Sequence, residues 1–132
     1  MAAAESICRS LCDKYPNQLL LHGDLHHDNI LLDTNKRYRI IDPKGVAGDS
    51  IFDIPRFILN EFDDLDDNFT KKFAHITRTL SAKFNIPEYD IRRVTYVEMC
   101  MAHCWNVESA EEPEMECVLF TEKMMDEAVT YT

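Results

Sequence analysis

Apolar residues along the 132-residue chain follow two patterns, which divide the sequence into helices and short strands. Apolar positions spaced three and four residues apart predict amphipathic helices, whereas short apolar runs between turn-forming residues predict strands. Helices are predicted over residues 3–15, 52–62, 68–84, 88–108 and 114–129, and strands over residues 19–22, 29–33 and 38–42. This order of one helix, three strands and four helices predicts a mostly helical α+β domain.

Turn-forming residues separate these elements. DTNKR joins the second and third strands and predicts a small hairpin, and PKGVAGDS (residues 43–50) is expected to be a loop. Asp53 is expected to be the N-cap of the next helix, with Pro55 in its first turn. The helix over residues 88–108 is the expected centre of the core. Its apolar side chains at core-compatible spacing are Val94, Val97, Met101, Cys104 and Trp105.

Composition and charge narrow the classes of function. The chain is 45% hydrophobic and 29% charged, as in an ordinary soluble protein, and its net charge is −10. This charge argues against nucleic acid and anionic membranes as partners. No apolar run is long enough to span a membrane, and the first residues lack the pattern of a signal peptide. We therefore expect a cytoplasmic protein whose five cysteines are reduced.

The segment LLLHGDLHHDNILLD, residues 19–33, holds more polar side chains than a turn between strands requires. One hypothesis is a zinc site with ligands drawn from His22, Asp24, His26 and His27. A second is a turn in which Asp and Asn bond the backbone, which explains one or two of these residues. A further C-x-x-H-C cluster at residues 100–104 is expected to be small side chains on a buried helix face instead of a zinc site.

The third hypothesis for this segment is a phosphoryl-transfer site. Such a site needs a carboxylate for the proton of the attacking hydroxyl, and amide or carboxylate oxygens that bind Mg²⁺. Asp24 and Asn29 have the spacing of the kinase catalytic loop H-R-D-x-x-x-x-N, with His22 two positions before the aspartate. Asp42 follows at the end of the next hairpin strand, where a metal-binding carboxylate would stand. The agreement of residue types and spacings favours this hypothesis over the other two.

The stretches HGDLHHDN, IIDPKGVAGD and FDIPRFILNE together resemble the aminoglycoside and hydroxyurea phosphotransferase family, most of all its streptomycin 6-kinase-like branch. The resemblance covers residues 19–61 and continues more weakly through IRRVTYVEMCMAHCWN. It implies the C-terminal lobe of a protein-kinase-like fold over residues 1–132, with a small β-hairpin that carries the catalytic and metal loops. It also implies ATP and Mg²⁺ as cofactors and a small hydroxyl-bearing substrate.

The same resemblance implies a role for individual residues. Asp24 matches the catalytic aspartate, and Asn29 and Asp42 match the residues that hold the metal and the nucleotide phosphates. His22 matches a histidine that supports the loop, and Asp53 matches an aspartate that holds the loop from beneath. Lys44 is a candidate phosphate contact or an ordinary loop lysine, and the roles of His26 and His27 stay open.

Two classes of function follow from the sequence. One is a kinase that phosphorylates a small cationic substrate, an aminoglycoside such as streptomycin, as in antibiotic resistance. The other is a non-catalytic remnant or interaction domain, because no G-x-G-x-x-G loop occurs in the sequence and about eighteen residues precede the catalytic strand. We expect this chain alone to be folded but nearly inactive. Exposed strands near residues 19–22 and 38–41 are expected to favour self-association.

Overall fold

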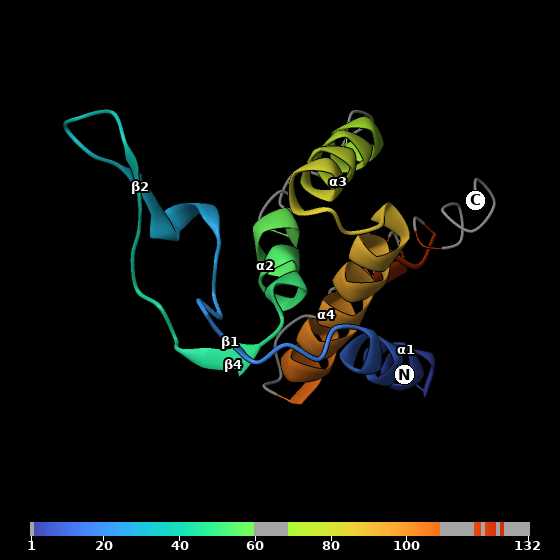
Figure 1. The fold of residues 1–132 in the computed structure, drawn as a ribbon. Coiled ribbons are helices and arrows are strands. Elements are labelled where there is room, and N and C mark those ends of the chain that lie inside the picture. The colour runs from blue at the N-terminus through green and yellow to red at the C-terminus, as the bar shows by residue number, and fades with distance from the viewer. Residues whose placement is uncertain (1, 60–68, 109–117, 120, 124, 126–132) are drawn as a thin grey trace.

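The protein is a mostly helical α+β domain in the computed structural model, which describes residues 2–59, 69–108, 118–119, 121–123 and 125 (Figure 1). The α-helices are α1 (Ala2–Lys14), α2 (Ile54–Leu59), α3 (Phe69–Phe84) and α4 (Glu88–Glu108). The strands are β1 (Leu19–Leu21), β2 (Ile30–Leu32), β3 (Tyr38–Ile40) and β4 (Val46–Gly48). Short 3-10 helices, η1 (His27–Asn29) and η2 (Ser50–Asp53), precede β2 and α2. The predicted class and the first, third and fourth predicted helices are confirmed.

The strands form two separate antiparallel sheets of two strands each. The predicted hairpin is confirmed, because β2 pairs with β3 and Ile30 lies opposite Ile40. The prediction of a plain loop over residues 43–50 is wrong, because β4 lies within it and pairs with β1, with Leu21 opposite Val46. Short strands are stabilised by cross-strand partners, and this partner is distant in sequence, so the local composition indicated a loop instead.

Helix α4 is the centre of the helical body, and α1, α2 and α3 all pack against it (Figure 1). The buried apolar side chains of this core include Leu11, Ile51, Ile58, Phe73, Ile91, Val94 and Val97. Val94 and Val97 are buried as predicted, but the prediction for Met101 is wrong, since its side chain is 60% exposed. The side chains of Cys104 and Trp105 lie outside the described residues, as does most of the predicted last helix.

The predicted N-cap is also wrong. The helical turns begin at η2, with Asp49 as N-cap, and continue directly into α2. Asp53 is therefore the last residue of η2, and its carboxylate is free to face another segment of the chain.

The end of α1 is attached to the start of α4 through Asp90, whose side chain is 2% exposed. Lys14 Nζ donates to Asp90 Oδ2 over 2.6 Å, and Tyr15 Oη donates to the same oxygen. Burial by itself would raise the pKa of Asp90, but the bonds from Lys14 and Tyr15 outweigh burial and the pKa is lowered. Burial and then the bond to Asp90 raise the pKa of the Tyr15 hydroxyl.

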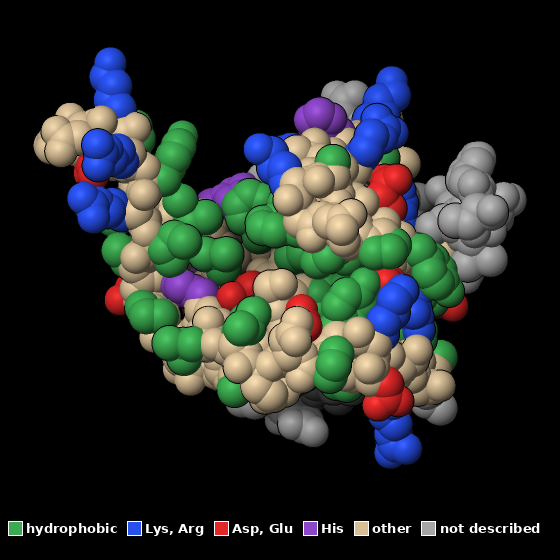
Figure 2. Space-filling model, viewed as in Figure 1, with side chains coloured by type: hydrophobic (Ala, Val, Ile, Leu, Met, Phe, Trp, Pro, Cys, Tyr) green, Lys and Arg blue, Asp and Glu red, His purple; other side chains and the backbone are tan. Residues whose placement is uncertain are grey.

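Apolar side chains gather on the surface between the β2–β3 hairpin and the helices α2 and α3 (Figure 2). A cavity of about 460 Å³ lies there, with walls formed by Ile30, Tyr38, Ile40, Phe57, Leu80 and Phe84. Leu20 on β1 and Tyr38 on β3 are 85% and 75% exposed. Among the described residues, no helix is both long and apolar enough to cross a membrane.

Candidate active site

The polar segment forms a compact loop that starts where β1 ends. Its turn depends on Gly23, which has a φ of +86°, a conformation that side chains with a Cβ rarely adopt. A Cβ at this position would also lie 3.1 Å from Lys44 Cβ and 3.1 Å from Val46 Cγ2. The close approach of the segment after β3 therefore adds a second reason for glycine.

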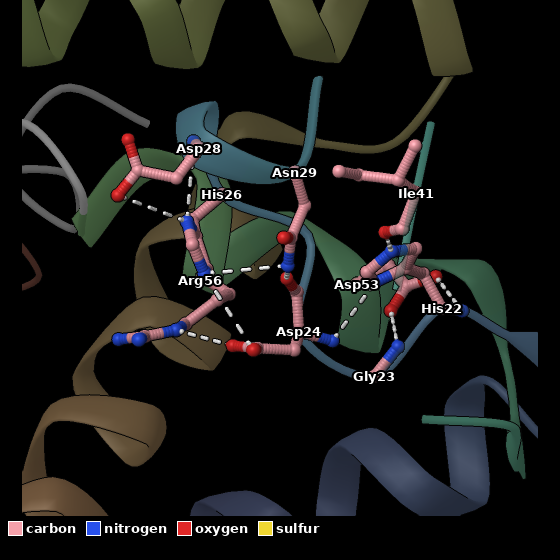
Figure 3. A network of polar contacts seen from close by, with 9 residues as sticks. All are labelled: His22, Gly23, Asp24, His26, Asp28, Asn29, Ile41, Asp53 and Arg56. Atoms are coloured by element: carbon pink, nitrogen blue, oxygen red, sulfur yellow. Dashed lines mark hydrogen bonds and ion pairs between the residues drawn. The ribbon is translucent and has the colours of Figure 1, made fainter. Parts of the chain in front are cut away.

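Asp53 holds this turn from beneath (Figure 3). Its Oδ2 accepts from the backbone N–H of His22 and its Oδ1 accepts from the backbone N–H of Gly23, each over 2.9 Å. One carboxylate thus binds two consecutive amides of the loop from the junction of η2 and α2.

The ring of His22 connects the loop to the segment after β3 (Figure 3). Its Nδ1 accepts from the backbone N–H of Asp24 over 3.1 Å, and its Nε2 donates to the carbonyl of Ile41 over 2.6 Å. A backbone N–H only donates and a carbonyl only accepts, so the ring is neutral with its proton on Nε2. The backbone N–H of Lys44 donates to the carbonyl of His22, and that of Ile41 donates to the carbonyl of Asn29. These bonds fix residues 41–44 against the loop.

The carboxylate of Asp24 is anchored at one oxygen. Arg56 Nε on α2 donates to Asp24 Oδ1 over 3.0 Å, and His26 Nε2 lies 3.5 Å from Asp24 Oδ2. Burial alone would raise the pKa of Asp24, but the hydrogen bond and charge of Arg56, followed by the charges of His26 and Lys44, lower it. Asp24 is thus held as a carboxylate, with Oδ1 bonded to Arg56 and Oδ2 near His26. The sequence gives one indication that Arg56 could contact this loop, because Arg56 lies one helical turn after Asp53.

Neither histidine after Asp24 is arranged as part of a metal cluster. His26 Nδ1 accepts from the backbone N–H of Asp28 over 3.3 Å, and its Nε2 lies 3.3 Å from Asn29 Nδ2 and 3.5 Å from Asp24 Oδ2. The His27 ring packs edge-on against Phe57, with ring centroids 4.8 Å apart. Both nitrogens of His22 already make hydrogen bonds. In the part of the chain that the structure describes, no group of three or more His, Cys, Asp or Glu side chains is placed to hold a metal ion.

Asn29 is buried, and its amide is oriented by the loop itself. Its Nδ2 donates to the carbonyl of Asp24 over 2.9 Å. This bond assigns the remaining Oδ1 as the atom that can bind a cation. Asp42 directly follows Ile41 and has a φ of +53°, which is uncommon for a residue other than glycine.

The structure therefore brings His22, Asp24, Asn29 and Asp53 together by direct hydrogen bonds. Asp42 and Lys44 come next to them through the backbone bonds of the segment after β3, and their side chains are exposed. An amide oxygen and a carboxylate are ligands suited to Mg²⁺, which takes one or two protein ligands and completes its shell with phosphate oxygens and water. A carboxylate held at one oxygen can accept a proton at the other. These metal-ligand oxygens and this proton-accepting carboxylate are the kinds of group that phosphoryl transfer requires.

Comparison with known proteins gives an independent result. The model of the family described as aminoglycoside/hydroxyurea antibiotic resistance kinase matches residues 1–111. A streptomycin 3''-kinase of Klebsiella pneumoniae is 37% identical over 67 residues, which cover 51% of this chain and 24% of that relative. No solved structure matches the chain.

Proposed function

The chain belongs to the aminoglycoside/hydroxyurea antibiotic resistance kinase family, and from this premise we propose that it carries the catalytic loop of an ATP- and Mg²⁺-dependent phosphotransferase. The substrate is a small polar molecule with a hydroxyl group. The observation that carries the proposal is the hydrogen-bonded unit of His22, Asp24 and Asn29. This unit resembles the kinase catalytic loop in residue types, spacing and chemistry.

Asp24 is the catalytic carboxylate in this proposal. It accepts, through Oδ2, the proton that the substrate hydroxyl releases as its oxygen bonds to the γ-phosphorus of ATP and ADP departs. His22 and Asp53 are positioning residues, because they act on the backbone of residues 22–24 and not on the substrate. The anchored Oδ1 keeps the carboxylate in one orientation.

Asn29 and Asp42 would hold the metal, through an amide oxygen and a carboxylate oxygen. Mg²⁺, when bound with nucleotide, supplies positive charge that stabilises the phosphate oxygens during transfer. Lys44 is a tentative phosphate contact, since its backbone is bonded to His22 and its side chain is exposed beside the loop.

The domain organisation proposed is a single kinase-like C-terminal lobe over residues 1–132. The match to the streptomycin kinase spans 24% of that relative's length, and the 132 residues contain no G-x-G-x-x-G loop to cover the phosphates. We therefore expect weak ATP affinity and little or no activity from this chain alone. The alternative is a non-catalytic interaction domain that retained the loop.

Aminoglycosides such as streptomycin are the proposed substrates, because they are polyhydroxylated cations and the chain carries a net charge of −10. The proposed location is the cytoplasm, where ATP is available. Self-association is proposed through the exposed apolar surface of β1 and β3, which includes Leu20 and Tyr38.

The test combines an ATP titration by calorimetry in the presence of Mg²⁺ with a phosphotransfer assay on streptomycin. In an enzyme that includes this chain, Asp24→Asn should lower turnover by about two to four orders of magnitude. Asp28→Asn is the matched control, because this exposed carboxylate lies in the same loop. Near-normal turnover of the Asp24 variant would disprove its role, and robust Asp24-dependent transfer by the isolated chain would disprove the fragment hypothesis.

A further inference from the structure

Two cysteines lie on one face of α1. Cys8 and Cys12 are four residues apart in this helix, so their side chains are neighbours, with about 5–6 Å between the Cβ atoms. The side chain of Cys8 is partly buried and that of Cys12 is exposed. Burial, and then the charge and hydrogen bond of Cys12, raise the pKa of the Cys8 thiol, which is consistent with two thiols in close proximity. The proposed function leaves this pair without a role.

A third sulfur atom lies on the helix that packs against α1. Helices α1 and α4 are in contact, and both cysteines line a cavity of about 400 Å³ that these two helices help to form (Figure 1). Met101 lines the same cavity from α4, and its side chain is 60% exposed, so its thioether is not fixed in the core. A methionine side chain has three rotatable bonds, which allow its sulfur to turn toward the two thiols.

The groups around the pair favour a soft metal ion. Within the described ranges, no third His, Cys, Asp or Glu side chain completes a metal-binding group with the two cysteines. The hydroxyl of Tyr15, on the same face of α1, already donates to Asp90. A structural zinc site needs four nitrogen, oxygen or thiolate ligands, which this pair lacks. Thiolate and thioether ligands instead select Cu(I), an ion that is stable with only two or three ligands.

A disulfide between Cys8 and Cys12 is the competing chemistry, and the helix opposes it. The Cβ atoms of a disulfide lie about 3.5–4.5 Å apart, which is shorter than the spacing of about 5–6 Å that an undistorted helix gives these residues. Closing the bond would therefore distort α1. A metal ion between the two sulfur atoms makes a longer bridge, which fits the helix without distortion.

We propose that Cys8, Cys12 and Met101 form a binding site for a monovalent copper ion, Cu(I). The two thiols release one proton each and bind the ion as thiolates, and the thioether of Met101 is the third ligand. The positive ion lies between two negative sulfur atoms and offsets their mutual repulsion. Because α1 and α4 both contribute ligands, bound copper also holds these two helices together and stabilises the folded chain.

The first test titrates the whole 132-residue chain, reduced and under anaerobic conditions, with Cu(I) in competition with a coloured Cu(I) chelator. Loss of a group that only supports a metal ligand already weakens metal binding about 10–100-fold, so Cys8→Ser and Cys12→Ser should each weaken the tightest site about 100-fold or more. Met101→Leu keeps the size of the side chain, removes its sulfur and should weaken the site about tenfold. Thermal unfolding without copper verifies that each variant is folded.

Two controls separate the site from thiols in general. Cys12→Ser combined with Asp13→Cys keeps the number of thiols and moves one of them by a single exposed position. This shift turns the thiol by about 100° around the helix axis, away from Cys8, so the variant should bind Cu(I) as weakly as Cys12→Ser does. Cys104→Ser, a change in the C-x-x-H-C cluster, should leave the affinity unchanged.

The second test is X-ray absorption at the copper edge, which should show three sulfur ligands in the wild type and two in Met101→Leu. Full affinity in the variant with the moved thiol, or tight binding that persists when Cys8→Ser and Cys12→Ser are combined, would overturn the site. Unchanged affinity and an unchanged sulfur count in Met101→Leu would overturn the role of the thioether. These measurements involve neither ATP nor phosphate transfer, so their outcome is independent of the proposed function.

Discussion

Arg56 Nε lies 3.0 Å from Asp24 Oδ1, across 32 positions of sequence. Three residues before Arg56 on the same helical segment, Asp53 binds the amides of His22 and Gly23. The segment that runs from η2 into α2 thus contacts this loop twice, once at the backbone of His22 and Gly23 and once at the side chain of Asp24. The two contacts differ in exposure and in the groups that they satisfy, so they should contribute differently to stability.

We expect Asp53→Asn to lower the free energy of unfolding by about 2 kcal/mol, because asparagine has one acceptor oxygen and its NH2 group would face the second backbone amide without a hydrogen bond. Arg56→Met should cost less than about 1 kcal/mol, because half-exposed ion pairs contribute little. Urea denaturation of the two variants measures the difference. A larger loss in Arg56→Met than in Asp53→Asn would contradict this assignment.

A pair of glycines tests the shape of the turn. Gly23 and Gly45 both have a positive φ, but a Cβ at 23 would meet Lys44 and Val46 at 3.1 Å, whereas a Cβ at 45 would meet nothing within 4 Å. Gly45→Ala should therefore lower the free energy of unfolding only by the cost of a positive φ for alanine, about 1 kcal/mol. Gly23→Ala should cost about 2 kcal/mol or more, because the neighbouring segment must also shift. Equal losses in urea denaturation would mean that the close approach is unimportant.

Much of this loop could be predicted from sequence because its information is local. His22, Asp24 and Asn29 lie within eight positions, and their bonds join residues two and five apart. The hairpin of β2 and β3 was predictable for the same reason, since a short turn connects its strands.

The parts that sequence did not reveal depend on distant partners. Strand β4 exists because it pairs with β1, and neither strand has a local pattern strong enough to predict that pairing. Arg56 was missed because the carboxylate that it binds, Asp24, lies 32 positions earlier in the sequence. Met101 was expected in the core, but its side chain is 60% exposed.

The contact between α1 and α4 should depend on pH through Asp90. Its pKa is lowered in the folded protein, so its contribution to stability is present above the unfolded value of about 3.9 and is lost as the pH falls through the folded value. Asp90→Asn should cost about 2 kcal/mol at pH 7. The difference between wild type and variant, followed by thermal unfolding, should shrink as the solution is acidified below the unfolded value. A difference that stays constant to the lowest pH would show that the carboxylate charge is not involved.

Metal binding should depend on nucleotide. Mg²⁺ keeps its waters and relies on phosphate oxygens, so Asn29 and Asp42 alone should bind it weakly. Calorimetric titration of Mg²⁺ should show clear binding only when a non-hydrolysable ATP analogue is present, and Asp42→Asn should weaken it. Tight Zn²⁺ binding without nucleotide, abolished by substitution of His26 and His27, would instead support the zinc hypothesis.

The exposed strands should make the chain self-associate at high concentration. Leu20 and Tyr38 lie on β1 and β3 with side chains that are 85% and 75% exposed, and both two-stranded sheets leave unpaired edges among the described strands. Lysine on an edge strand opposes pairing with another chain, because it places charge where the partner would pack. Leu20→Lys combined with Tyr38→Lys should therefore shift the chain toward monomer in sedimentation velocity. Leu119→Lys, a change at another exposed apolar residue away from the strands, should leave the association unchanged. A wild-type chain that stays monomeric across the concentration range would show that this surface does not bind a second copy.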